Sequence, residues 1–135
     1  MNIKLKNNIL YLAEYMIKCA VGKRGITIKK KEGDNKTPAG NFKFETIFYR
    51  KDRISLAKTY LQKIVIKKNM GWCDDSSSKF YNKLIKFPFL YNAEKLWLTE
   101  NVYDVVVIIN YNINPVVKKK RKCYFFTYCK KKLYS

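Results

Sequence analysis

The sequence predicts one mainly β domain with long ordered loops. Three observations predict it: apolar and polar residues alternate in several segments, β-branched and aromatic residues are frequent, and the 135 residues include only five glycines and three prolines. With 47% hydrophobic residues, the chain can form a modest core in one small domain. This composition excludes a disordered or fibrous protein.

Each predicted element follows from its local pattern. Phenylalanines alternate with charged residues in 41–48, and residues 103–111 are so continuously apolar that we expect a central strand covered on both faces. Gly22 and Gly25 flank a basic turn. Short helices are expected at 54–62 and 93–97. In chain order, the strands are expected at 9–12, 15–21, 41–48, 63–67 and 103–111.

Two loops have unusual chemistry. In residues 31–42, two glycines supply backbone freedom, and Pro38 biases the preceding residue toward an extended conformation. The second loop begins at 70–75 and contains the adjacent carboxylates Asp74 and Asp75. Paired carboxylates suit acid–base or metal chemistry, but adjacent aspartates are more often turn formers or partners of basic side chains. Cys73 is expected to be packed rather than reactive.

Charge and missing residue types restrict the function further. The net charge of +19 favours polyanionic partners, whereas the absence of histidine removes the commonest general base and zinc ligand. The four cysteines have no CxxC spacing, so we expect neither a metal site nor a cofactor. No apolar run reaches the roughly 18–20 residues of a membrane span. Because Glu14 interrupts the first apolar run, no signal peptide is expected.

Seven segments, in this order, carry a specific family pattern: CAVGKRGI at 19–26, KKEGDNKTPAGNF at 30–42, YRKDR at 49–53, MGWCDD at 70–75, YN at 81–82, EKLW at 94–97 and YDVVVIINYN at 103–112. Together they resemble the L,D-transpeptidase catalytic domain, specifically its short, single-domain, YkuD-like branch of bacteria. The resemblance runs collinearly over residues 9–117, and its most recognisable element is Gly-Asp-x-x-Thr-Pro-x-Gly.

The resemblance implies a YkuD-like β-sandwich and a role in peptidoglycan cross-linking or remodelling. In that chemistry a cysteine thiolate attacks a stem-peptide carbonyl, and an amine acceptor then takes the acyl group. The implied partners are stem peptides, without a cofactor, in the cell envelope or periplasm. The implied substrate-groove loops contain Asp34, Thr37, Pro38 and Gly40 in one, and Trp72, Asp74, Asp75, Tyr81 and Asn82 in the other.

The pattern fails where the family's catalytic groups should stand. The family's histidine and Gly-Cys loop follow the strand at 103–112, but residues 118–135, KKKRKCYFFTYCKKKLYS, contain neither. We therefore expect a partial catalytic domain over 1–117, a basic aberrant tail over 118–135, and no catalytic residue in this chain. Loss of the final strands is expected to expose the edge and one face of 105–109, and to cost roughly 5 kcal/mol of stability.

Several explanations of this ending stay open. A frameshift could have replaced the true end, the chain could be a decayed copy, or the tail could be a genuine basic arm. Two further functional classes follow: a non-catalytic peptidoglycan-binding module, and a basic nucleic-acid-binding module that uses the lysine- and aromatic-rich tail. Nucleic acid is the less favoured partner, because the sequence has no RNP-type Gly-Phe-x-Phe element.

Overall fold

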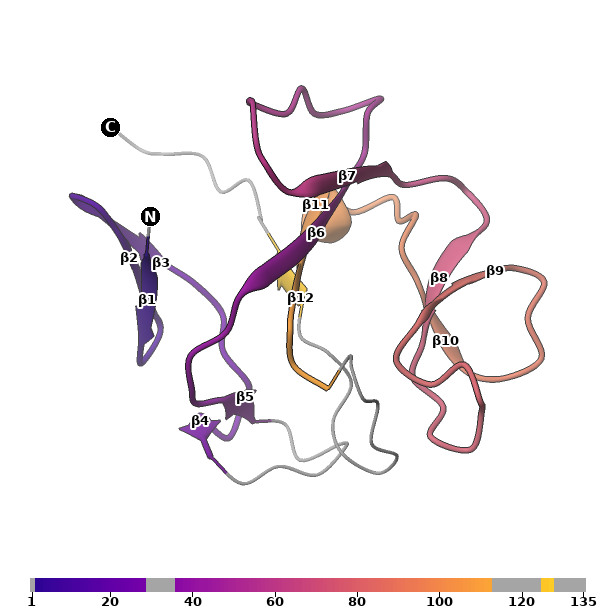
Figure 1. Ribbon diagram of the computed structural model, residues 1–135, viewed down its shortest axis with the longest axis horizontal. Helices are drawn as coiled ribbons and strands as arrows, with labels where there is room; N and C mark the ends of the chain where they lie inside the picture. The colour runs from indigo at the N-terminus through magenta and orange to yellow at the C-terminus, as the bar shows by residue number, and fades with distance from the viewer. Residues whose placement is uncertain (1, 29–35, 113–124, 128–135) are drawn as a thin grey trace. The chain divides into compact units, whose positions relative to one another are not determined.

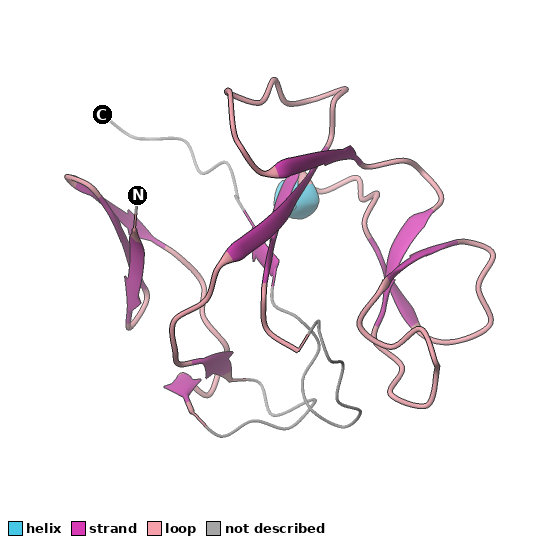
Figure 2. Ribbon diagram, in the orientation of Figure 1, coloured by secondary structure: helices cyan, strands magenta, loops and turns pink. Residues whose placement is uncertain are grey.

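The computed structural model describes residues 2–28, 36–112 and 125–127, and the chain divides into two units, Met1–Asn41 and Phe42–Ser135. Strands and loops make up nearly all of the described chain (Figures 1 and 2), which confirms the mainly β prediction. No helix among the described residues is long and apolar enough to cross a membrane. The elements are β1 (Ile3–Lys6), β2 (Ile9–Leu12), β3 (Tyr15–Lys18), β4 (Ile26–Thr27), β5 (Thr37–Pro38), β6 (Phe44–Tyr49), β7 (Gln62–Val65), β8 (Met70–Cys73), β9 (Leu84–Lys86), β10 (Ala93–Lys95), the 3-10 helix η1 (Asn101–Tyr103), β11 (Val105–Ile109) and β12 (Phe125–Thr127).

The first unit begins with an antiparallel meander in the order β1-β2-β3. Its strands are joined by two-residue turns, and the first residue of each turn, Asn7 and Ala13, has a positive φ. Such turns match the right-handed twist of paired strands, and asparagine tolerates this conformation well. β2 and β3 confirm the strands expected near the N-terminus. β1 was not predicted.

A short parallel pair follows in the same unit, formed by β4 and β5. Before it, Gly25 N–H donates to the Gly22 carbonyl over 2.8 Å, so the basic turn predicted between these glycines is present. Gly25 has a φ of 80°, a conformation that explains glycine at this position. The turn therefore leads into a parallel pair and not into a hairpin.

The second unit contains two sheets, with strand orders β12-β11-β6-β7 and β10-β8-β9. In the first, β11 is antiparallel to β6 and β12, whereas β6 is parallel to β7. In the second, β8 is central and antiparallel to both neighbours. Figure 1 shows these sheets as separate groups of arrows, with β6 and β11 crossing the middle of the unit.

One apolar core joins the two sheets of this unit. Phe48 of β6 packs edge-to-face against Trp72 of β8, with ring centroids 6.3 Å apart. β11 buries alternate side chains, Val106 and Ile108, while its other three residues are half-buried. Of the two faces expected to be covered, one is therefore buried and the other is covered in part. The core cluster comprises Phe48, Ile66, Met70, Trp72, Leu96, Val106 and Ile108.

Both predicted helices are wrong. Residues 93–95 form β10, because Ala93 and Glu94 pair with Cys73 and Trp72 of β8. Residues 54–61 form an irregular loop, and Gln62 already begins β7. In that loop the Thr59 hydroxyl accepts a hydrogen bond from Leu61 N–H, a local alternative to helical pairing.

The expected open edge of 105–109 is also wrong. Val106, Val107 and Ile108 of β11 pair with Thr127, Phe126 and Phe125 of β12, so both edges of β11 are paired along these residues. The tail over 118–135, which is predicted to be aberrant, therefore supplies β12, a strand that the sequence does not predict. The rest of 118–135 lies outside the described residues.

Candidate functional site

In the described part of the predicted first loop, residues 36–42, Thr37 stands at the start of β5. The Thr37 hydroxyl accepts a hydrogen bond from Gly22 N–H over 2.7 Å, and Thr37 N–H donates to the Gly25 carbonyl over 2.8 Å. Pro38 is buried, and Gly40 is exposed with a φ of 142°. These residues connect the loop to the preceding basic turn. Asp34, the fourth predicted residue here, lies outside the described residues.

The predicted second loop is organised around the buried side chain of Asn82. Its carbonyl oxygen accepts from Trp72 Nε1–H over 3.1 Å, and its amide donates to the Asn112 carbonyl. Asn82 N–H also donates to the Cys73 carbonyl over 2.9 Å, and φ is 63°. Tyr81 beside it is only 1% exposed. The predicted residues Trp72, Tyr81 and Asn82 are therefore buried, and they do not form an exposed substrate-binding surface.

The glycine of the Met-Gly-Trp sequence, Gly71, stands where the neighbouring chain leaves no room for a side chain. A β-carbon at Gly71 would lie 2.6 Å from Phe87 Cε2 and 3.0 Å from the Glu94 carbonyl oxygen. Both distances are shorter than an unstrained contact, so only glycine lets β9 and β10 approach β8 this closely. The next residue, Trp72, lies in the core and donates to the buried Asn82.

The adjacent carboxylates are half-buried and act differently. Asp75 forms a turn: its Oδ1 accepts from Ser77 N–H over 3.0 Å and from the Ser77 hydroxyl over 2.6 Å. These hydrogen bonds from Ser77 lower the pKa of Asp75. The pKa of Tyr103 is raised, first by burial, then by its hydrogen bond to Glu94, and further by the charges of Glu94 and Asp74. No cluster of three metal-ligating side chains occurs among the described residues.

Neither described thiol has the features of an activated nucleophile. Cys73 has 0% exposed surface, and its Sγ lies 3.9 Å from the Asp75 carbonyl oxygen. Cys19 is half-buried, and burial raises the pKa of its thiol. The expectation that Cys73 is packed is confirmed.

We expect Cys73 to resist alkylation in the folded protein, because its sulfur is enclosed. Brief iodoacetamide treatment, followed by peptide mass mapping with and without urea, checks this. Cys73 should be modified only after unfolding, whereas modification of Cys19 should rise with pH as its thiolate forms. Rapid native labelling of Cys73 would contradict the burial described here.

An arginine network that sequence reasoning missed lies after β6, within the YRKDR segment. Arg50 is 3% exposed, and its Nε and Nη2 donate to the two carboxylate oxygens of Asp52 over 2.8 and 2.7 Å. Its Nη1 donates to the Leu98 carbonyl over 2.8 Å, and Cζ lies 3.4 Å from the centroid of the Trp97 ring. The only signal in the sequence is the single aspartate among the three basic residues of YRKDR, which is equally typical of an exposed turn.

The neighbouring Arg53 completes this network. Its Nη1 donates to Asp104 Oδ1 over 2.9 Å, and its Nη2 donates to the Thr99 carbonyl over 3.1 Å. Asp104 is buried, and its own carbonyl accepts from Arg50 N–H. The two arginines therefore tie the turn after β6 to residues 97–104. The pKa of Asp52 is lowered, chiefly by its hydrogen bonds from Arg50.

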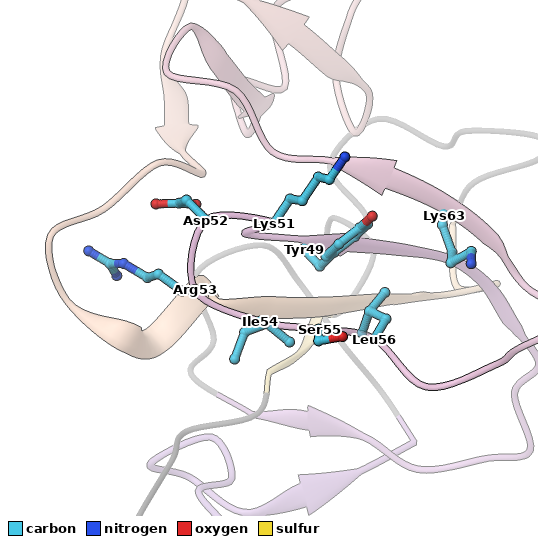
Figure 3. A pocket seen from close by; sticks show the side chains of 8 residues that line it. All are labelled: Tyr49, Lys51, Asp52, Arg53, Ile54, Ser55, Leu56 and Lys63. Atoms are coloured by element: carbon cyan, nitrogen blue, oxygen red, sulfur yellow. The ribbon is translucent and has the colours of Figure 1, made fainter.

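An open hollow of about 480 Å³ borders this turn. It is lined by residues 51–56 together with Tyr49 and Lys63. Figure 3 shows Lys51 above Tyr49 and Lys63 to its right, with Ser55 and Leu56 below the tyrosine ring. None of the predicted groove residues lines it.

The predicted site residues therefore fall into two separate groups. Thr37, Pro38 and Gly40 belong to the first unit, and the second loop belongs to the other unit. Within each group the motif residues determine the conformation of their loop. A comparison of the chain with family models, with curated proteins and with solved structures finds no match.

Proposed function

We propose that this chain is an L,D-transpeptidase-like, YkuD-like protein of the cell envelope that binds peptidoglycan stem peptides. The observation that carries the proposal is that the family-like motif residues are those that hold both loops. Thr37 ties its loop through Gly22, and Asn82 ties the other through Trp72. A residue that matches the family's pattern and also determines the conformation of its loop supports the family assignment better than a match in sequence alone. The second unit's two sheets and shared core are compatible with a sandwich.

The proposal is limited to binding, because the 135 residues contain no histidine. Acyl transfer by a cysteine needs an activated thiolate and donors that hold the oxyanion. Cys73 is enclosed, and the thiol of Cys19 has a raised pKa. We therefore assign no transfer step to the described residues.

Among the predicted groove residues, Asp74 has the side chain best suited to contact a stem peptide. It directly follows β8, is half-buried, and lies close enough to raise the pKa of Tyr103. A carboxylate at this position can pair with the amine of an acceptor stem. Asp75 has a structural part in its turn, because Ser77 and the main chain of Asn92 donate to it.

Co-sedimentation with purified sacculi, stripped of anionic wall polymers, tests the proposal. Because the net charge of +19 promotes unspecific retention, binding is measured at low salt and at about 1 M salt, where the screening length is about 3 Å. We expect retention at high salt and release by excess soluble stem peptide. At low salt, where an ion pair is least screened, Asp74→Asn should weaken the retention that stem peptide can release about fivefold, the effect of one close ion pair in water.

Glu45→Gln is the matched control, because Glu45 is an exposed acidic residue of β6 outside both loops. Its retention should equal that of the unchanged protein. Retention that disappears with salt, in parallel with binding to a single-stranded oligonucleotide, would replace the proposal by the basic nucleic-acid-binding alternative. If Asp74→Asn and Glu45→Gln changed retention equally, Asp74 would not be a contact residue for the stem peptide.

A further inference from the structure

We propose that the open hollow beside the loop that connects β6 to β7 binds a small anion carried on an apolar body. Its volume of about 480 Å³ falls within the range of small-ligand sites. The walls come from Tyr49 at the end of β6, the irregular loop that follows it, and Lys63 of β7 (Figure 3). All of these residues belong to the second unit.

The charge of the hollow is positive because its acidic residue is already neutralised. Asp52 receives two hydrogen bonds from Arg50, which lies beneath the turn and is itself buried. Arg53 directs its guanidinium to Asp104 and to the Thr99 carbonyl. The acidic and the guanidinium groups at this rim are therefore engaged with protein partners.

Two ammonium groups remain for a ligand. Lys51 and Lys63 are exposed, and neither forms an ion pair with a described carboxylate. In Figure 3 Lys51 extends above Tyr49 and Lys63 lies to its right, and both line the same hollow. Two lysines beside one cavity form a site for an anion, because each supplies a full charge and several hydrogen-bond donors.

The remaining lining selects an anion with an apolar body. Tyr49 contributes a half-buried ring, Ile54 and Leu56 contribute half-buried aliphatic groups, and Ser55 contributes an exposed hydroxyl. An aromatic or aliphatic group can pack against the first three, while the hydroxyl donates to an anion oxygen. A phosphomonoester and a carboxylate share this chemistry, so the experiment must separate them.

Titration of the full, nitrogen-15-labelled chain with phenyl phosphate, with benzoate and with neutral benzyl alcohol tests the site by NMR. We expect saturable shifts of the Tyr49, Lys51 and Ser55 amides with at least one anion, and none with the alcohol. Saturation by phenyl phosphate alone identifies a phosphate ligand. Saturation by benzoate alone identifies a carboxylate ligand, and saturation by both leaves the shared anionic chemistry as the determinant.

Lys51→Gln and Lys63→Gln should each weaken binding about fivefold, the expected effect of one close charge in water. Lys86→Gln is the control, because Lys86 is an exposed lysine of β9 outside the hollow. If neither anion saturates the shifts, or if Lys86→Gln weakens binding as much as the other two variants, the proposal is overturned. Because the hollow contains none of the predicted groove residues, this result is independent of sacculus binding.

Discussion

Replacing Arg50 by methionine is expected to lower the free energy of unfolding of the second unit by about 3 kcal/mol. The guanidinium is buried, donates to the Leu98 carbonyl, and stacks on Trp97 with Cζ 3.4 Å from the ring centroid. A hydrogen bond from a charged donor contributes about 1.5–3 kcal/mol, and a cation–π contact about 0.5–2 kcal/mol. Asp52 adds little to this loss, because its side chain is 47% exposed and regains water.

Urea unfolding followed by tryptophan fluorescence measures this effect. Both tryptophans of the chain, Trp72 and Trp97, lie in the second unit, so the signal reports that unit. Lys51→Met is the matched control, because it removes an exposed charge from the same turn. We expect the control to change stability by less than about 0.5 kcal/mol. Equal stability of the two variants would show that the arginine network contributes nothing.

The effect of Arg50→Met should also depend on pH. Hydrogen bonds from Arg50 lower the pKa of Asp52 in the folded protein below its unfolded value of about 4. This contribution to stability is therefore present above about pH 4 and disappears as the pH falls through the lowered pKa. The difference in stability between the two proteins should accordingly shrink in acid, but only by a small amount, because the Asp52 side chain is 47% exposed.

The strands that could be predicted are those whose own pattern matches their burial. In β11, the uninterrupted β-branched residues from Val105 to Ile109 admit no other element. In contrast, the residues of β10 have a helical spacing, and only pairing with Cys73 and Trp72 makes them a strand. Tertiary pairing overrides such local preferences, and it cannot be read from the segment itself.

In the candidate site, too, features set by the local sequence could be predicted, and features set by distant residues could not. Thr37 could be selected because Thr-Pro determines the loop locally, and its partner Gly22 is in the nearby turn. The burial of Arg50 could not be predicted, because arginine is ordinarily exposed and its partner Leu98 is 48 positions away. The hollow depends on β6 and β7 pairing in parallel around an irregular loop, where the sequence predicts a helix.

Replacing Asn82 by alanine is expected to destabilise the second unit by about 3 kcal/mol, for two separable reasons. The indole N–H of Trp72 would lose its buried acceptor, and the Asn112 carbonyl would lose a donor, at a cost of about 1–3 kcal/mol. In addition, a φ of 63° costs alanine about 1 kcal/mol, whereas glycine adopts it freely. Asn82→Gly should therefore be destabilised less than Asn82→Ala.

The same fluorescence measurement compares both variants with Asn92→Ala. Asn92 is exposed, and its contribution to the loop is a main-chain N–H that alanine retains. We expect this control to unfold like the unchanged protein. Equal stability of Asn82→Gly and Asn82→Ala would eliminate the backbone contribution, because only that contribution separates them. If both also matched Asn92→Ala, the buried hydrogen bond between Trp72 and Asn82 would not stabilise the loop. This loop would then no longer support a peptidoglycan-binding function.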